Sequence, residues 1–197
     1  MKVIQVRCPH CNNPIMMKQK DLLFLCDNCK TMHVRDGGVT VVDYEIGDFG
    51  RGAPQGDRVY VPFWRLYCSF NINNVRVEGG SLFKLSNWVK GGAGSSGAIF
   101  IFIPASDFDP ATFKRLAIML TTMPPKYASR TDFNNIPRLP ATMSKGEAGQ
   151  MAHFVVITME AEKPGILQDI DYSLKVNDAR AVYLPFITSP QGLILGL

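Results

Sequence analysis

The sequence contains no apolar run that approaches the length of a membrane span. Its longest run covers residues 98–105, whereas a helix needs about 20 apolar residues to cross a bilayer. The first seven residues lack the apolar segment of a signal peptide, and no Asn-x-Ser/Thr glycosylation acceptor occurs in the 197 residues. We therefore expect a cytoplasmic protein that does not insert into membranes.

Charge is sparse, and so are catalytic motifs. Charged residues make up 19% of the chain and the formal net charge is +4, which gives only weak support for binding to nucleic acid. The glycine- and serine-rich loop 91–97 precedes an apolar strand and lacks Gly-Lys-Ser/Thr, so it does not fit a phosphate-binding loop. No nucleophile stands beside a base, and the acidic residues are scattered. An enzymatic function is left open, but the sequence leans away from it.

Cysteine is scarce too, yet four of the five cysteines form two Cys-x-x-Cys pairs with fourteen residues between them. One such pair on a tight turn directs two thiolates at a single ion, and a second pair completes a tetrahedron. A redox disulfide pair is the alternative, but two pairs at this spacing favour a metal. We expect one structural zinc per chain, with iron as the less favoured ion. The predicted ligands are Cys8, Cys11, Cys26 and Cys29.

Strand-forming segments flank both cysteine pairs, and residues 1–46 resemble a zinc ribbon, the rubredoxin-like fold with two zinc knuckles. Asn12 and Lys30 stand where that family often has glycine, and asparagine suits the left-handed backbone better than lysine does. Because four cysteines already complete the coordination, we interpret the nearby His10 and His33 as residues outside the ligand set.

The ribbon carries a small basic surplus. From residue 1 to residue 36 there are six basic and three acidic residues, a surplus of three that falls to about one when four thiolates and one Zn²⁺ add −2. Phe24 is the only aromatic residue there, and its apolar neighbours place it in the core. Nucleic-acid-binding proteins combine a basic stripe with exposed aromatic residues. We therefore favour a structural or protein-facing ribbon, with nucleic acid as the alternative.

The rest of the chain predicts an α+β fold, mainly antiparallel with about two helices. Residues 47–57 are rich in glycine and proline and read as a linker between the ribbon and a domain over 58–197. Asp109 is a natural N-cap before Pro110 and predicts a helix that ends before residue 123. A capping box predicts a second helix over 144–163, although residues 154–158 have strand propensity.

Strands are predicted between turn-forming residues. Asn73-Asn74 and Asn177-Asp178 are both predicted to be turns, and Pro62 indicates an edge position or a bulge. Cys68 falls on an apolar alternation and is assigned to the core. The pattern Val-Tyr-x-Pro-Phe occurs twice, at 59–63 and 182–186, which indicates either an internal duplication or two similar edge strands. The predicted strands cover residues 58–72, 75–78, 81–85, 98–103, 169–176, 180–186 and 193–195.

These patterns favour a non-enzymatic zinc-binding protein. In this interpretation a structural ribbon is tethered to an α+β domain that binds a protein partner, as an adaptor or assembly factor. One alternative is a nucleic-acid-associated zinc-ribbon protein. The other is an enzyme with a pocket near His153 under the proline-containing segment 123–143, because long loops are often functional. The sequence does not specify an oligomeric state.

Overall fold

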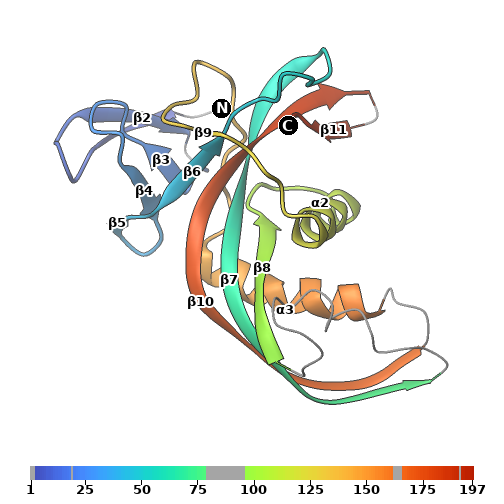
Figure 1. Cartoon of the computed structure of the whole chain (residues 1–197). Helices are drawn as coiled ribbons and strands as arrows, with labels where there is room; N and C mark the ends of the chain where they lie inside the picture. Colours follow the sequence, from blue (N-terminus) through green and yellow to red (C-terminus); the bar gives the residue numbers. More distant parts are fainter. Residues whose placement is uncertain (1–2, 19, 79–95, 162–165, 191) are drawn as a thin grey trace.

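Two long strands, β7 (Asp57–Glu78) and β10 (Ile166–Ser189), run side by side through the molecule (Figure 1). The computed structural model describes residues 3–18, 20–78, 96–161, 166–190 and 192–197. The two strands pair antiparallel along their length, from Asp57 opposite Thr188 to Glu78 opposite Ile166. The predicted strand 81–85 and most of the loop 91–97 lie outside the described residues.

Within the described residues, four shorter strands complete the large sheet around this pair. The order along the main path is β8-β7-β10-β6-β9, and β11 also pairs with β10. Every pairing is antiparallel except that of β6 with β10. The mixed α+β class with mainly antiparallel strands is therefore as predicted. The shorter strands are β6 (Tyr44–Gly47), β8 (Ser96–Pro104), β9 (Ser129–Arg130) and β11 (Gly192–Leu195).

Two helices occur in the described part of the chain, and both begin where the sequence predicts. Helix α2 (Pro110–Thr122) starts after Asp109, whose side chain accepts hydrogen bonds from the backbone of residues 111 and 112. Helix α3 (Lys145–Ala161) starts with a capping box in which Ser144 and Glu147 each accept from the other's backbone N–H. Helical periodicity thus prevails over strand propensity at 154–158. Neither described helix is both long enough and apolar enough to span a membrane.

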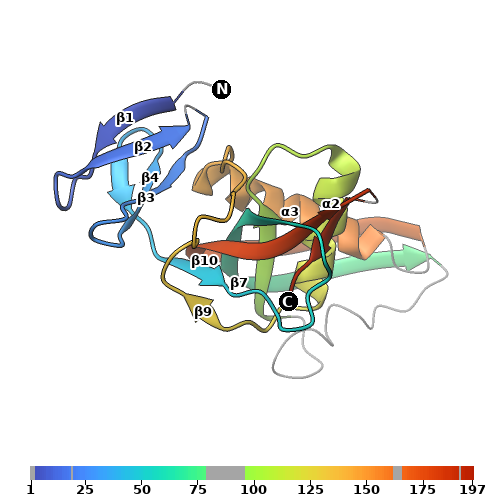
Figure 2. The ribbon, with the colours of Figure 1, turned by 90° about the horizontal axis from the view of Figure 1, so that it is seen from above.

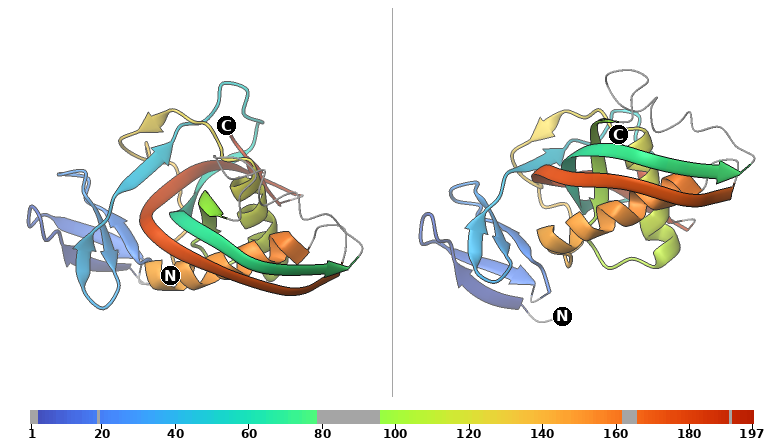
Figure 3. Two further views of the ribbon diagram at one scale, coloured as in Figure 1. Left: turned by 60° about the horizontal axis from the view of Figure 1, so that its bottom comes forward. Right: turned by 90° about the horizontal axis from the view of Figure 1, so that it is seen from below.

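The two predicted asparagine turns are wrong, because the chain continues as strand through both. Asn74 pairs with Asp171 and Ile72 with Tyr172, which leaves Asn73 as an extra residue in β7. Likewise Asn177 is the extra residue in β10, between the paired residues 176 and 178. Each asparagine is a β-bulge, a feature that bends a strand without ending it. Figure 3 shows β7 and β10 bending together.

The two Val-Tyr-x-Pro-Phe segments lie directly opposite each other, from Val59 opposite Phe186 to Phe63 opposite Val182. This register relates the two copies by a local two-fold arrangement. Phe63 stacks on Phe186 at 6.0 Å between ring centroids. The two tyrosines of the pattern, Tyr60 and Tyr183, both pack against the ring of Phe133. That an internal duplication produced the two copies remains a prediction.

β7 is an interior strand, with β8 on one side and β10 on the other, but Pro62 lies where the pairing with β8 has ended. Its carbonyl accepts a hydrogen bond from Ala105 N, so its backbone faces the β8 side, just beyond the last β8 pair at Phe63. The missing N–H therefore interrupts no ladder bond. Pro185 repeats this arrangement, and its carbonyl accepts from Gly196 N just beyond β11.

The predicted ribbon and the large sheet share one hydrophobic core. Leu23, Leu25 and Met32 from the N-terminal strands pack in the same buried cluster as Trp64. Asp21, fully buried, joins the two parts, because its Oδ1 accepts from Leu23 N at 3.2 Å and from Ala141 N at 2.9 Å. Arg138 lies 3.6 Å from the other carboxylate oxygen of Asp21.

The predicted linker connects two strands of the large sheet. Residues 48–56 lead from β6 to β7, and β6, at the end of the predicted ribbon, pairs with β10. The loop is held by backbone bonds from Asp48 N to Ala128 O and from Gly50 N to Gly196 O. That residues 1–46 and 58–197 unfold as separate units stays a prediction.

Candidate metal centre

Short strands connected by two knuckles lie at one end of the molecule (Figure 2). The knuckles carry the four clustered cysteines. The first knuckle connects the antiparallel pair β1 and β2. The second connects β3 and β4, which form a three-stranded sheet with β5. Turn-forming residues between strand-forming segments produce this arrangement. The strands are β1 (Val3–Arg7), β2 (Pro14–Lys18), β3 (Leu23–Leu25), β4 (Met32–Arg35) and β5 (Val39–Val41).

Both knuckles have the same backbone geometry. In the first, Cys8 N donates to Asn13 O at 2.8 Å and Asn12 N donates to Cys8 O at 2.8 Å. In the second, Cys26 N donates to Thr31 O at 3.0 Å and Lys30 N donates to Cys26 O at 2.8 Å. Asn12 and Lys30 adopt the left-handed conformation, with φ of 60° and 52°. Lys30 thus occupies the position that glycine often fills. The hydroxyl of Tyr44 donates a hydrogen bond to the carbonyl of Lys30 at 2.9 Å.

The four sulfur atoms form one cluster. All lie within 4.8 Å of one another, with 3.5 Å between Cys11 and Cys26 and 3.7 Å between Cys8 and Cys29. Zinc–sulfur bonds of about 2.3 Å in a tetrahedron place the sulfurs roughly 3.8 Å apart. The cluster therefore fits a four-thiolate ion site. One cysteine of each pair, Cys8 and Cys26, is buried, while the other is half-buried.

Local hydrogen bonds and burial act in opposite directions on these thiols. The side-chain amide of Asn13 lies 3.4 Å from the sulfur of Cys11 and is the largest cause that lowers the pKa of Cys11 to about 5. Thr31 lowers the pKa of Cys29 in the same way, whereas burial raises the pKa of Cys26 to about 12. A bound divalent cation keeps all four thiolates deprotonated because it replaces their protons.

The two histidines predicted to lie outside the ligand set differ in their surroundings. His10 is exposed on the first knuckle. His33 is fully buried on β4, and its Nε2 lies 3.3 Å from the sulfur of Cys8. Neither belongs to the cluster of mutually close ligand atoms, which contains only the four cysteines. Sequence reasoning missed the contact of His33 because it depends on how the two knuckles pack.

The remaining chemical candidates lie apart from the cysteine cluster. Cys68 is fully buried in the large core, as predicted, and burial raises the pKa of its thiol to about 12. His153 is exposed on α3, where its Nδ1 lies 3.1 Å from the hydroxyl of Tyr172.

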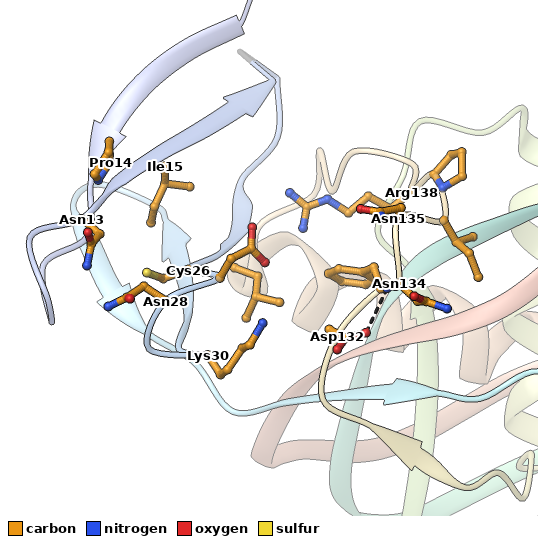
Figure 4. Close-up of a pocket in the computed structure, with 15 residues that line it drawn as sticks. Asn13, Pro14, Ile15, Cys26, Asn28, Lys30, Asp132, Asn134, Asn135 and Arg138 are labelled. Atoms are coloured by element: carbon orange, nitrogen blue, oxygen red, sulfur yellow. Dashed lines mark hydrogen bonds between the residues drawn. The ribbon is translucent and has the colours of Figure 1, made fainter.

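The segment 123–143 does line a cavity, of about 880 Å³, together with the second knuckle (Figure 4). Asn135 and Arg138 face Asn28 and Lys30 across it. His153 does not line this cavity. Thr142 and Met143 of the same segment line a second cavity, of about 340 Å³, with Gln150 and Met151 of α3, so the predicted enzyme site near His153 stays a prediction.

A group of two exposed rings and one half-buried arginine on the large sheet was also missed. Tyr67 on β7 and Phe100 on β8 form a directly opposed pair, with 5.1 Å between their ring centroids. They are 38% and 44% exposed. The guanidinium of Arg65 lies over the Phe100 ring at 5.5 Å. We call Arg65, Tyr67 and Phe100 the aromatic patch. The alternation that places Leu66 and Cys68 in the core could have predicted that Arg65 and Tyr67 lie on the opposite face of β7.

Comparison of the chain with protein-family models, curated proteins and solved structures gave no match. The assignment of a function therefore depends on the cysteine cluster and on the surfaces of this structure alone.

Proposed function

We propose that this chain is a non-enzymatic zinc-binding protein in which the metal holds the ribbon and the large sheet presents a protein-binding surface. The observation that carries the metal part is the closed cluster of four sulfur atoms. Four cysteine ligands complete a tetrahedral shell and leave no position for a substrate, which is typical of structural zinc. Soft thiolates also accept iron, so zinc is the favoured ion of two.

The position of the cluster supports a structural role. Phe24 and Ile15 pack with the cysteines in a small core that contains few other buried residues. So small an apolar cluster stabilises a fold only weakly, and metal binding supplies the missing free energy in modules of this size. The adjoining strands β3 and β4 then present Leu23 and Met32 to the large core.

The aromatic patch supports a protein partner. Tyrosine, phenylalanine and arginine are enriched at protein–protein interfaces, where a few such residues supply most of the binding free energy. The rings of Tyr67 and Phe100 are already packed together and so lose little conformational freedom on binding. Arg65 is fixed by Glu45, with two bonds of 2.8 and 3.0 Å. The patch is therefore preorganised.

Association of the ribbon with nucleic acid has less support. Phe24, the only aromatic residue from 1 to 36, is buried and cannot stack on bases. Around the aromatic patch, the cations Lys175 and Arg180 and the anion Asp178 lie on the neighbouring strand β10, and the anion Asp43 lies just before β6. A mixed surface of this kind does not favour a polyanion.

Metal analysis of the purified full chain tests the first half of the proposal. We expect about one zinc per chain and loss of that zinc in Cys8→Ser, since three thiolates leave the tetrahedron incomplete. The matched control is Cys68→Ser, because Cys68 lies away from the cluster and should leave the zinc content unchanged. A folded wild-type chain without bound metal would contradict the proposal.

A pull-down from the native cell extract tests the second half. The double substitution Tyr67→Ser with Phe100→Ser should abolish capture of a protein that the wild-type chain retains. Met123→Ser is the matched control, since it changes another apolar side chain that is 70% exposed. If both variants retained the same proteins, or if only nucleic acid bound, the patch would not be the interaction surface.

A further inference from the structure

His33 is the one buried side chain from outside the two knuckles with a polar contact to a cluster sulfur among the described residues. Its Nε2 lies 3.3 Å from the sulfur of Cys8. His33 is 0% exposed and Cys8 is 2% exposed, so solvent does not compete for this contact. We propose that His33 is a positioning residue of the metal centre, whose Nε2–H donates a hydrogen bond to the Cys8 thiolate. The inference depends on the proposed function, because it requires a metal-bound thiolate.

The direction of the hydrogen bond follows from the chemistry of the two atoms. A metal-bound thiolate has no proton to donate, so the proton between the two atoms belongs to Nε2. A neutral imidazole with a proton on Nε2 has a bare Nδ1. That nitrogen has no hydrogen-bond partner within the described residues. An Nδ1 without a proton explains the missing partner better than an Nδ1–H does. Buried N–H groups without a partner are rarer in proteins than buried acceptors without one.

The ring is held in place by its neighbours on the sheet. His33 lies directly opposite Phe24 in the β3–β4 pair, and the two rings stack with 5.3 Å between centroids and 26° between planes. On its other side β4 pairs with β5, where Val41 lies opposite His33. These contacts fix the ring orientation before a metal arrives. His33 is not a ligand, since its nitrogen is outside the cluster of mutually close ligand atoms.

The contact also differs from the contacts that Asn13 and Thr31 make with the sulfurs. Cys11 has its partner in Asn13 and Cys29 has its partner in Thr31, each two residues further along the same knuckle. His33 instead reaches from β4, which follows the second knuckle, to Cys8 in the first. It therefore joins the two halves of the coordination shell. An N–H donor also withdraws charge from the thiolate and makes that sulfur less reactive towards electrophiles.

The sharpest test uses the wild-type full chain loaded with ¹¹³Cd²⁺, a tetrahedral thiolate-bound ion with nuclear spin. A hydrogen bond from Nε2–H to the metal-bound sulfur should give a scalar coupling between the ring proton of His33 and ¹¹³Cd. The Nε2–H signal is assigned to His33 by its correlations within the imidazole ring and by its loss in His33→Phe. A cadmium-bound chain in which this proton shows no coupling would overturn the inference and leave the proposed function standing. A chain that binds no cadmium or zinc would overturn both.

Substitutions give a second, independent readout. His33→Phe keeps a stacking ring and removes the donor, and it should weaken zinc binding about 10- to 100-fold in a chelator competition, the usual range for such supporting residues. The same variant should shift the sulfur-to-metal charge-transfer band of the Co²⁺-loaded chain and speed alkylation of Cys8. His33→Gln, which keeps an N–H donor, should lie between His33→Phe and the wild type.

His10→Phe is the matched control, since His10 is exposed on the first knuckle and outside the cluster. It should bind zinc as the wild type does. Equal zinc affinity, equal band position and equal alkylation rate in wild type and His33→Phe would overturn the inference. If His33→Phe does not fold, the coupling in the wild-type chain and the affinity of His33→Gln still decide it.

Discussion

At the scale of single residues, Glu45 resolves an unfavourable pairing in the large sheet. Arg65 and Arg180 lie directly opposite each other on β7 and β10, and like charges in that position destabilise a sheet. One oxygen of Glu45 accepts from Arg65 at 2.8 Å and from Arg180 at 2.6 Å. The other accepts from Tyr127 at 2.7 Å and from Arg65 at 3.0 Å. Burial raises the pKa of Glu45, but these donors together lower it to about 2.

We expect Glu45→Gln to destabilise the chain by roughly 1–3 kcal/mol, because it leaves two half-buried arginines opposite each other without an anion. Urea unfolding at pH 7 measures this loss. Asp48→Asn is the matched control: Asp48 pairs with Arg130 at 3.1 Å but is 48% exposed, so its removal should cost less than about 1 kcal/mol. Equal losses in the two variants would show that Glu45 is no more than a surface ion pair.

The pH dependence of this contribution has a definite sign. The pKa of Glu45 is lower in the folded chain, about 2, than its ordinary value of 4.5. The carboxylate therefore contributes fully above pH 4.5, and the contribution is lost as the pH falls from 4.5 towards 2. In that window the wild type should lose more stability than Glu45→Gln does. Parallel stability curves for the two proteins below pH 4.5 would contradict this.

Residue identity predicts some of the metal centre and not the rest. The spacing of the four cysteines is a local feature of the sequence, and it correctly predicts that their sulfurs lie together. The left-handed backbone at Asn12 also follows from its place in the knuckle. The contact of His33 with Cys8 spans 25 residues and depends on the packing of one knuckle against the other. No local pattern contains that packing.

At the scale of elements, the two asparagine bulges show where local turn chemistry fails. Asparagine favours turns because its side chain bonds nearby backbone and tolerates unusual dihedral angles. Those properties also suit a bulge, so Asn73 and Asn177 do not distinguish the two outcomes. The distinction comes from the long ladder on both sides of each bulge, which continues the strand. The helices were predictable because their caps are local.

Helix α2 covers the free edge of β8, the outermost strand on that side of the large sheet. The backbone N–H of Phe102 donates to the hydroxyl of Thr121 on α2 at 3.0 Å, in a buried position. Edge strands with free N–H groups tend to pair with other chains, and a helix that covers the edge prevents this. Thr121 is 2% exposed, so this single hydroxyl replaces a neighbouring strand at that point.

We expect Thr121→Val to destabilise the chain by about 1–3 kcal/mol, since it keeps the shape and leaves a buried N–H without its acceptor. It should also promote concentration-dependent association, measured by analytical ultracentrifugation. Thr122→Val is the matched control, because the Thr122 hydroxyl donates only to carbonyls of its own helix, those of Ile118 and Met119. Equal stability of the two variants would mean that solvent satisfies the Phe102 N–H.

At the scale of the whole molecule, the shared core couples the ribbon to the large sheet. The sequence predicts a boundary between the two at the glycine-rich segment 47–57, because its composition is typical of a flexible linker. It does not report which apolar faces meet. Leu25 and Met32 of the ribbon share a buried cluster with Trp64 and Leu66 of the sheet. Asp21 adds a buried carboxylate between β3 and Ala141, and a buried group of this kind is costly to leave without its partners.

Zinc should therefore stabilise the sheet as well as the ribbon. In Trp88→Phe, Trp64 is the only remaining tryptophan, and its buried indole donates to Met143 O at 2.9 Å, so its fluorescence reports on the large core. With free zinc at 1,000 times its Kd, the unfolding free energy measured at Trp64 should exceed the metal-free value by about 4 kcal/mol. The matched control, Asp21→Asn, weakens the junction and should reduce that difference. If Trp64 unfolds at the same urea concentration with and without zinc while the cysteines become reactive, residues 1–46 and 58–197 are independent units. The shared core would then transmit none of the metal-binding free energy to the sheet.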